Sequence, residues 1–168
     1  MPGPVPPEEL ARLLDRHSAA LALYARQLCD CQDDVVQEAF IELAGQRESP
    51  QEPAAWLYRV VRNRAIGASR SGRRRQRREA AAARDTGAWF VAADSGLDAE
   101  EATAALASLP DESREVVVAH LWGGLSFVEI GRLTGTSDST AHRRYQEALS
   151  TLRDKLGAPC PKPTNRRT

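Results

Sequence analysis

Residues 126–152 are the stretch that most limits how this chain can fold. Ser126 and Glu129 have the three-residue spacing of a helix-capping box, which predicts that a helix begins there. Gly135 supplies the backbone freedom that a sharp turn needs, and Ser137 can cap a following helix. Helical spacing in that second helix predicts a buried stripe of Ala141, Tyr145, Ala148 and Leu152. We therefore expect two helices joined by a tight turn.

The opposite face of the second predicted helix is polar and partly cationic. It carries Ser139, His142, Arg143 and Gln146, with Arg144 beside them. Side chains of these types reach base edges and phosphates. Such a helix pair is typical of a helix-turn-helix that binds DNA. Judged from these residues alone, an ordinary helical hairpin with a solvated polar face is the alternative.

Charge is segregated along the chain, although 23 basic and 23 acidic residues give a net charge of zero. Residues 29–52 carry seven acids and one Arg, and residues 85–115 carry eight acids and one Arg. Between them, residues 59–84 hold ten Arg and one Glu, and residues 116–168 hold eight bases and four acids. Blocks of this kind indicate different surfaces for differently charged partners.

Apolar residues at helical spacing predict three helices in the first half of the chain, roughly through 10–28, 33–44 and 54–70. Val35, Val36, Ala39, Phe40 and Leu43 form the inward face of the second, which Asp33 or Asp34 can cap. Carboxylates, an amide and an aliphatic side chain remain on its outward face: Asp34, Gln37, Glu38 and Ile41. Acidic helix faces are usually only solvated, but this mixture also suits a protein partner with a basic surface.

The third predicted helix has a basic strip on one side. Helix geometry brings within an arc of about 100° the side chains of Arg59, Arg62, Asn63, Arg70 and Arg73. Trp56 lies at the edge of this strip, where it can either stack on a base or pack in the core. Guanidinium groups with an aromatic ring suit single-stranded or melting DNA.

The whole pattern predicts an all-α protein made of two small helical domains joined by a flexible linker. We expect the first domain at 1–79, the linker at 80–101, the second domain at 102–157 and a disordered tail at 158–168. Trp89 and Phe90 are unusual for a spacer, so we expect them to dock on a domain.

Several function classes have no support in the sequence. No apolar run approaches the ~20 residues of a membrane span, and the start of the chain has no apolar signal core, so we expect a cytoplasmic protein. Cys29, Cys31 and Cys160 lack the spacing of a zinc site, so we expect reduced thiols and neither a metal nor a cofactor. No nucleophile–base pair, carboxylate pair or phosphate-binding loop stands out, so we do not expect an enzyme.

Three ordered segments together resemble the sigma-70 family of bacterial RNA polymerase sigma factors, and within it the short extracytoplasmic function (ECF) group. DDVVQEAFIELA at 33–44 is similar to the segment with which that family grips core RNA polymerase. AAWLYRVVRNRAIGASR at 54–70 is similar to its promoter-melting, minus-ten-reading helix. Residues 106–156 resemble its region 4, which reads the minus-thirty-five element.

The resemblance implies a promoter-specificity subunit whose partners are core RNA polymerase, promoter DNA and an anti-sigma factor. Polymerase contact would fall to Asp34, Gln37, Glu38 and Ile41. The minus-ten strand would be bound by Trp56, Arg59, Arg62, Asn63, Arg70 and Arg73, with loop 47–51 near a flipped base. The minus-thirty-five duplex would be bound by Ser137, Ser139, Thr140, His142, Arg143, Arg144 and Gln146.

The sequence departs from the family pattern at a few of these positions. Gly67 stands where the family usually has an acid, and Gly131 where it has Ala; glycine inside a helix costs about 1 kcal/mol relative to Ala. His142 replaces a more usual Lys and Glu147 a more usual Arg. Both changes weaken the binding of DNA phosphates by the second helix of the predicted helix-turn-helix.

Two other functions fit parts of the sequence. A stand-alone helix-turn-helix regulator that binds operator DNA as a dimer would account for 126–152 but not for 33–70. An adaptor whose arginine run binds RNA or acidic proteins would account for the charge alone.

Overall fold

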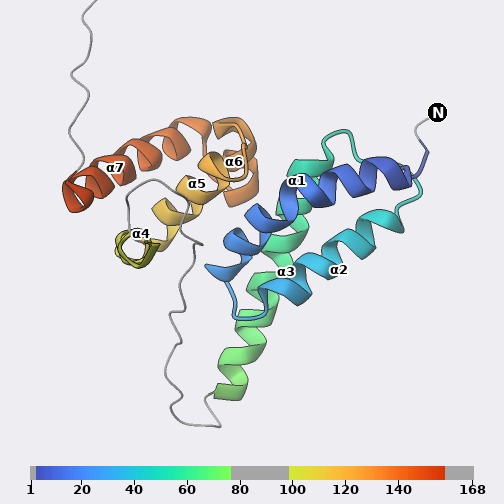
Figure 1. Cartoon of the computed structure of the whole chain (residues 1–168), viewed down its shortest axis with the longest axis horizontal. Coiled ribbons are helices and arrows are strands. Elements are labelled where there is room, and N and C mark those ends of the chain that lie inside the picture. Colours follow the sequence, from blue (N-terminus) through green and yellow to red (C-terminus); the bar gives the residue numbers. More distant parts are fainter. Residues whose placement is uncertain (1–2, 77–98, 158–168) are drawn as a thin grey trace, which may run out of the picture.

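The structure is a computed structural model that describes residues 3–76 and 99–157, with side chains for 3–72 and 101–157. Every regular element in these ranges is an α-helix, which confirms the all-α prediction. In chain order the helices are α1 Pro7–Arg26, α2 Gln32–Ala44, α3 Pro53–Gln76, α4 Ala99–Ala107, α5 Asp111–Leu121, α6 Phe127–Thr134 and α7 Asp138–Leu156 (Figure 1). Helix α4 begins inside the segment that we assigned to the linker, and Trp89 and Phe90 lie outside the described residues.

Helices α1, α2 and α3 form the N-terminal module, residues 3–76. The predicted inward face of α2 is confirmed, because all five of its apolar side chains are buried. The predicted cap is wrong: Cys31 is the N-cap residue of α2 and makes no side-chain cap bond. Asp33 and Asp34 instead occupy the first turn, where a carboxylate interacts favourably with the positive end of the helix dipole.

Helices α4 to α7 form the C-terminal module, residues 99–157. Here the predicted turn chemistry is confirmed. The Ser126 hydroxyl accepts the Glu129 N–H, and the Glu129 carboxylate in return accepts the Ser126 N–H at 2.7 Å. Gly135 adopts φ 71°, a left-handed conformation that favours glycine, and the Ser137 hydroxyl accepts the Thr140 N–H at 3.1 Å. Helices α6 and α7 are therefore the predicted helix-turn-helix.

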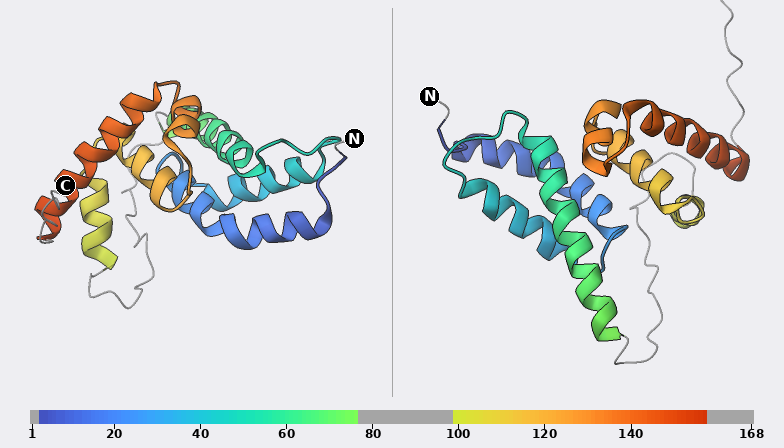
Figure 2. Two further views of the ribbon diagram at one scale, coloured as in Figure 1. Left: turned by 90° about the horizontal axis from the view of Figure 1, so that it is seen from above. Right: turned by 180° about the vertical axis from the view of Figure 1, so that it is seen from behind.

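The two modules pack against each other. Helix α5 contacts α1, and helix α6 contacts α3, as the two views in Figure 2 also show. One apolar core runs through both modules, because Val116, Val118 and Ile130 join the same buried cluster as Leu21 and Tyr24. Such a continuous core between the modules is a tertiary feature that the helical periodicities did not predict.

None of the helices in the described ranges is long and apolar enough to cross a membrane.

Candidate functional site

The outward face of α7 presents the side chains predicted to read duplex DNA. Ser139, His142, Arg143 and Gln146 are all exposed, whereas Ala141 and Ala148 on the opposite side are buried. Ser137 and Thr140 are engaged in capping, since the Ser137 hydroxyl also donates to the Thr140 hydroxyl at 2.8 Å. The helix-turn-helix thus leaves one polar face of α7 open to a partner.

The neighbouring arginines Arg143 and Arg144 of α7 are both in intramolecular ion pairs. Arg143 Nη1 lies 2.9 Å from Glu147 Oε1, and both side chains are largely exposed. Arg144 pairs with Glu112 of α5, and its side chain is only 20% exposed. Arg143 can reach a ligand by a simple rotamer change, whereas Arg144 must first leave Glu112.

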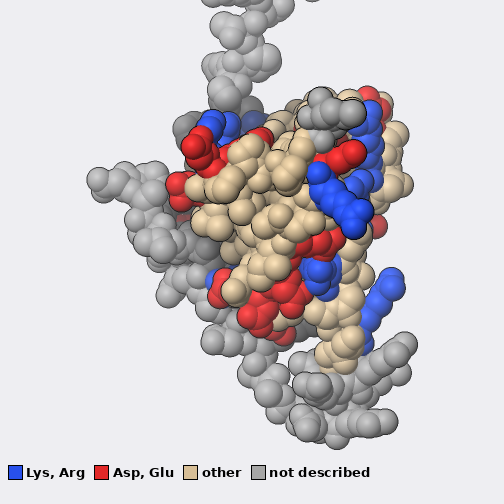
Figure 3. All heavy atoms as spheres, turned by 90° about the vertical axis from the view of Figure 1, so that its right-hand side faces the viewer, with Lys and Arg blue, Asp and Glu red and all other residues tan. Residues whose placement is uncertain are grey.

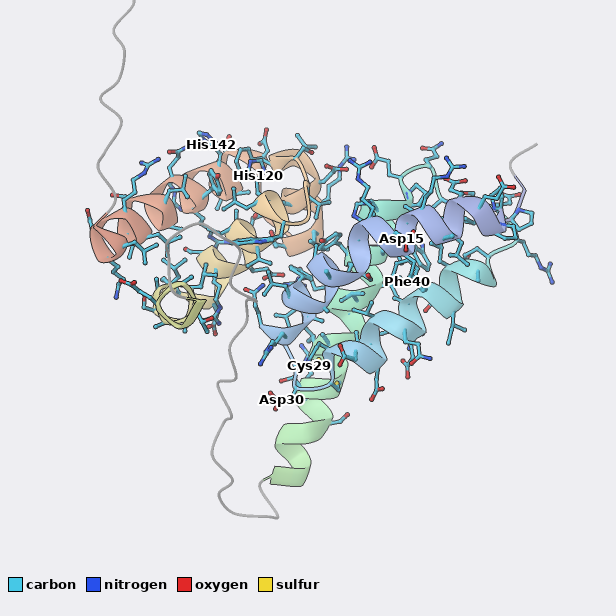
Figure 4. All side chains as sticks on the ribbon, viewed as in Figure 1. Asp15, Cys29, Asp30, Phe40, His120 and His142 are labelled. Carbon is cyan, nitrogen blue, oxygen red and sulfur yellow. The ribbon has the colours of Figure 1, made fainter. Side chains whose placement is uncertain are left out.

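An aromatic cluster supports the base of the recognition face. His120 stacks on Phe127 with ring centroids 4.4 Å apart, and the rings of His142 and Phe127 lie 4.9 Å apart in a T-shaped arrangement. Both histidines are labelled in Figure 4, on the C-terminal module. Tyr145 packs edge-on against His120 at 4.8 Å. His120 Nδ1 lies 2.7 Å from the Leu125 carbonyl oxygen, so this histidine packs within the module. Contact with Phe127 therefore holds the His142 side chain in one orientation on the outward face of α7.

The basic strip on α3 is only partly open. Arg59, Asn63 and Arg70 are exposed, while Trp56 is half-buried and packs against the core. The backbone of Arg73 belongs to α3, but its side chain lies outside the described residues. Three of the predicted strand-binding side chains thus share an accessible surface on α3.

Arg62 is the exception on this strip. Its Nε donates to Glu115 Oε1 at 2.7 Å, and the Tyr24 hydroxyl donates to the same oxygen at 2.5 Å. Burial lowers the pKa of Arg62, but the hydrogen bond and charge of Glu115 outweigh that effect and leave this pKa raised. Burial, with the Glu115 carboxylate, raises the pKa of Tyr24 well above its usual range. Both groups therefore keep their protons at neutral pH.

Helix α2 presents its predicted partner face beside an apolar groove. The groove, about 590 Å³ in volume, runs between α1 and α2, and Phe40 lies between these two helices in Figure 4. Its lining includes Leu14 and Ile41, which are 46% and 63% exposed, with Gln37 beside them. Two large apolar side chains so open to water mark a surface suited to a partner.

Glu38 has a partner within the chain. Arg64 of α3 reaches Glu38 with Nη1 and Glu42 with Nη2, each at 2.6 Å, while Asp34 and Gln37 are exposed. An arginine of the basic stretch 59–84 therefore neutralises two carboxylates of the acidic stretch 29–52. Seen from the right-hand side of Figure 1, acidic and basic residues lie next to one another at several places on a mostly uncharged surface (Figure 3).

Loop 45–52 leaves its predicted base-binding residues accessible. Arg47, Glu48 and Gln51 are exposed, and the Ser49 N–H donates to the Gly3 carbonyl oxygen at 2.8 Å.

The thiols of Cys29 and Cys31 lie 3.3 Å apart between α1 and α2. Within residues 3–76 and 99–157 there is no group of three or more His, Cys, Asp or Glu that could hold a metal ion.

Comparison with known proteins decides the family. The pattern described as "Sigma-70 region 2" matches residues 13–76, and that described as "Sigma-70, region 4" matches residues 99–152. The ECF RNA polymerase sigma factor SigK of Mycobacterium ulcerans is 31% identical over 148 residues, which cover 81% of this chain and 79% of SigK. The chain belongs to the ECF group of the sigma-70 family.

A longer relative and two solved structures are also similar to this sigma factor. The probable RNA polymerase sigma factor RfaY of Xanthomonas campestris is 30% identical over 149 residues, which cover 82% of this chain but 37% of RfaY. The fold is similar to that of the sigma factor RpoE from Bartonella quintana, solved with the anti-sigma factor NepR, with a TM-score of 0.68 and 21% identity over 91% of this chain and 99% of RpoE. It is also similar to CnrH, solved with the cytosolic domain of CnrY, with a TM-score of 0.56 and 22% identity over 91% and 90% of the two chains.

Sequence reasoning missed three residues of this sigma factor that join its modules: Tyr24, Tyr58 and Glu115. Tyr24 and Tyr58 pack edge-to-face, with ring centroids 5.1 Å apart. Glu115 is buried, and an acid directly before the apolar run of Val116, Val117 and Val118 is the signal that could have marked it.

Proposed function

We propose that this sigma factor is a promoter-specificity subunit, and not an enzyme, that binds core RNA polymerase in the cytoplasm and directs transcription initiation. The observation that carries this proposal is the open face of α7, the second helix of the capped helix-turn-helix. Ser139, His142, Arg143 and Gln146 project from this face. Such a face fits the major groove of a minus-thirty-five element.

The groove between α1 and α2 is the proposed polymerase-docking surface. Leu14, Phe40 and Ile41 offer an apolar floor, with Asp34 and Gln37 exposed on α2. An amphipathic helix with basic flanks would bury the exposed leucine and isoleucine and meet the carboxylates. Glu38 would take part through the Arg64 pair that it already makes.

Helix α3 is the proposed minus-ten reader. Arg59, Asn63 and Arg70 can bind phosphates and base edges of an unpaired strand, and Trp56 lies where a base could stack on its exposed edge. Two modest DNA contacts on one chain reinforce each other through effective concentration. We also propose an anti-sigma partner, because RpoE of Bartonella quintana was solved with one.

Transcription from a defined promoter with purified core polymerase tests the function. Full-length chain with core should start RNA at one site, and Arg143→Ala should weaken promoters with a cognate upstream element, with a discrimination loss of about 1–3 kcal/mol. Equal loss on every template would assign Arg143 to phosphate contact. Tight binding to operator DNA without polymerase, and no initiation, would identify a stand-alone regulator instead.

Co-purification with core polymerase tests the docking surface. We expect the double variant Asp34→Ala/Gln37→Ala and the variant Ile41→Glu to lose core polymerase while keeping their helical circular dichroism. Asp15→Ala is the matched control, because Asp15 is exposed on α1 but does not line the groove. Retention of core by the groove variants, or its loss in the Asp15 variant, would contradict the assignment.

A further inference from the structure

Two thiols meet in the turn that joins α1 to α2. Cys31 donates its S–H to the Cys29 sulfur, and the two sulfur atoms lie 3.3 Å apart. Both cysteines are free, and Figure 4 labels Cys29 and Asp30 at this turn. A disulfide bond is about 2 Å long, so closing one here draws the two sulfurs together by roughly 1.3 Å. The reduced pair is thus already arranged as the precursor of a disulfide.

The two sulfurs differ in their access to solvent. Cys29 is 8% exposed and belongs to the apolar core, whereas Cys31 is half-buried at the start of α2. Cys31 is the N-cap residue of α2, a position that favours Ser, Thr, Asp or Asn, yet it makes no side-chain cap bond. Core packing therefore accounts for Cys29, but capping does not account for Cys31. A dissolved oxidant meets Cys31 first, and Cys29 lies behind it as the second thiol.

The charges around this turn select the kind of oxidant. Asp30 lies exposed between the two cysteines, and Asp33 and Asp34 are exposed in the first turn of α2. Three carboxylates repel anionic oxidants such as glutathione disulfide, but they do not repel hydrogen peroxide, which carries no charge. Because Cys31 is half-buried, its surroundings also favour the smaller molecule.

We propose that Cys29 and Cys31 form a reversible disulfide site that hydrogen peroxide oxidises. The Cys31 thiolate attacks one peroxide oxygen and the O–O bond breaks, so that Cys31 becomes a sulfenic acid and the other oxygen leaves as hydroxide, which is protonated to water. The Cys29 sulfur then attacks the sulfenic sulfur, the S–O bond breaks, and a second water leaves with the Cys29 proton. In all, the two thiols lose two electrons and two protons, and the peroxide gains them. A dithiol reverses the reaction by thiol–disulfide exchange.

Closing this disulfide acts on both walls of the groove between α1 and α2. The Cys29 N–H donates to the Ala25 carbonyl oxygen at 2.9 Å, which ties Cys29 to the end of α1. The Val35 N–H donates to the Cys31 carbonyl oxygen at 3.1 Å, which ties Cys31 to the start of α2, where Asp33 lines the groove. We therefore expect the oxidised turn to change the shape of the groove and to weaken the docking of polymerase. This consequence rests on the proposed function, whereas the disulfide itself does not.

Peptide mass spectrometry of the full-length chain tests the disulfide. Trypsin cleaves after Arg26 and Arg47, so one peptide, 27–47, contains both cysteines. After treatment with hydrogen peroxide and then with iodoacetamide in urea, this peptide should carry no alkyl group and should be lighter than the reduced peptide by two hydrogen atoms. Dithiothreitol before alkylation should restore two alkyl groups. Two alkyl groups after peroxide, or a sulfinic acid at Cys31, would overturn the proposed site.

Two variants isolate the pair. Cys31→Ser removes the first thiol and supplies a preferred N-cap residue, so it should fold, and peroxide should leave its Cys29 reduced and open to alkylation in urea. Cys160→Ser is the matched control: it removes the third cysteine, which lies outside the described residues, and should still form the disulfide within 27–47. Circular dichroism checks the helices, and Cys29→Ala replaces Cys31→Ser if that variant loses helicity. A disulfide that involves Cys160, or that joins two chains, would contradict the assignment.

Co-purification with core polymerase tests the consequence. Peroxide should weaken the binding of core polymerase by the unsubstituted chain about tenfold, a size typical of coupling between two sites, and dithiothreitol should restore it. The same treatment should leave binding by Cys31→Ser unchanged. A disulfide that forms without any loss of binding, or an equal loss in Cys31→Ser, would overturn the effect on the groove. Failure of the reduced chain to bind core polymerase would instead count against the proposed function and not against the disulfide.

Discussion

Gly131 of α6 lies directly against the backbone of Thr136 in the turn of the helix-turn-helix. A Cβ on Gly131 would lie 2.8 Å from the Thr136 carbonyl oxygen and 3.1 Å from the Asp138 nitrogen. The Thr136 N–H also donates to the Gly131 carbonyl oxygen at 2.9 Å. The glycine that helix propensity alone marks as a cost thus allows the two helices of the motif to approach closely.

Gly131→Ala should therefore destabilise the protein by about 1–3 kcal/mol, because the crowded atoms belong to backbone and the turn must shift. Gly67→Ala is the matched control: Gly67 is exposed in α3 with nothing within 4 Å, so alanine should stabilise by about 0.5–1 kcal/mol. Urea unfolding of both variants checks the pair. A Gly131→Ala protein more stable than the parent would contradict the close approach.

Glu147→Gln should strengthen binding to the upstream promoter element. The substitution frees Arg143 from its exposed ion pair and removes a negative charge near DNA phosphates. Exposed pairs are worth about 0.2–1 kcal/mol, so we expect a gain of up to about fivefold in holoenzyme affinity for a cognate duplex. Combining Glu147→Gln with Arg143→Ala should remove the gain. If the gain persists in that double variant, the carboxylate acts on DNA directly and not through Arg143.

Stability should fall as the pH drops through the range in which His17 titrates. Burial, and then the charge of Arg16, lowers the pKa of His17 below its usual 6.5. The unfolded chain therefore binds a proton at a higher pH than the folded chain, and the contribution of neutral His17 is lost on acidification below about 6.5. Unfolding free energies measured at pH 7.5, 6.0 and 5.0 should show a shallower decline in His17→Gln. If the unfolding free energy declines equally with pH in the parent and in His17→Gln, His17 does not cause the loss of stability.

Cys29 should resist alkylation in the folded protein. Burial raises the pKa of the Cys29 thiol to about 12, so little thiolate is present near pH 8. Iodoacetamide followed by peptide mass spectrometry should leave Cys29 unmodified in buffer and modify it in urea. Equal modification in both conditions would show that the junction between α1 and α2 opens readily.

Local chemistry determined much of this protein before any tertiary contact was known. The capping box at Ser126, the left-handed turn at Gly135 and the cap at Ser137 depend on residues within a few positions of one another, so the sequence predicts them directly. The apolar face of α2 and the exposed Ile41 follow in the same way from helical periodicity. These features were enough to predict two helical modules and their candidate partner faces.

Only the tertiary structure decided which charges are available. Glu115 meets Arg62 across 53 positions of sequence, and Arg64 meets Glu38 across 26. Packing of α5 against α1, and of α2 against α3, brings these pairs together. Periodicity assigns a side chain to a face of its helix but does not say what covers that face. Arg59 and Arg62 are therefore equivalent in the sequence, yet one is open to solvent and the other is held by a buried carboxylate.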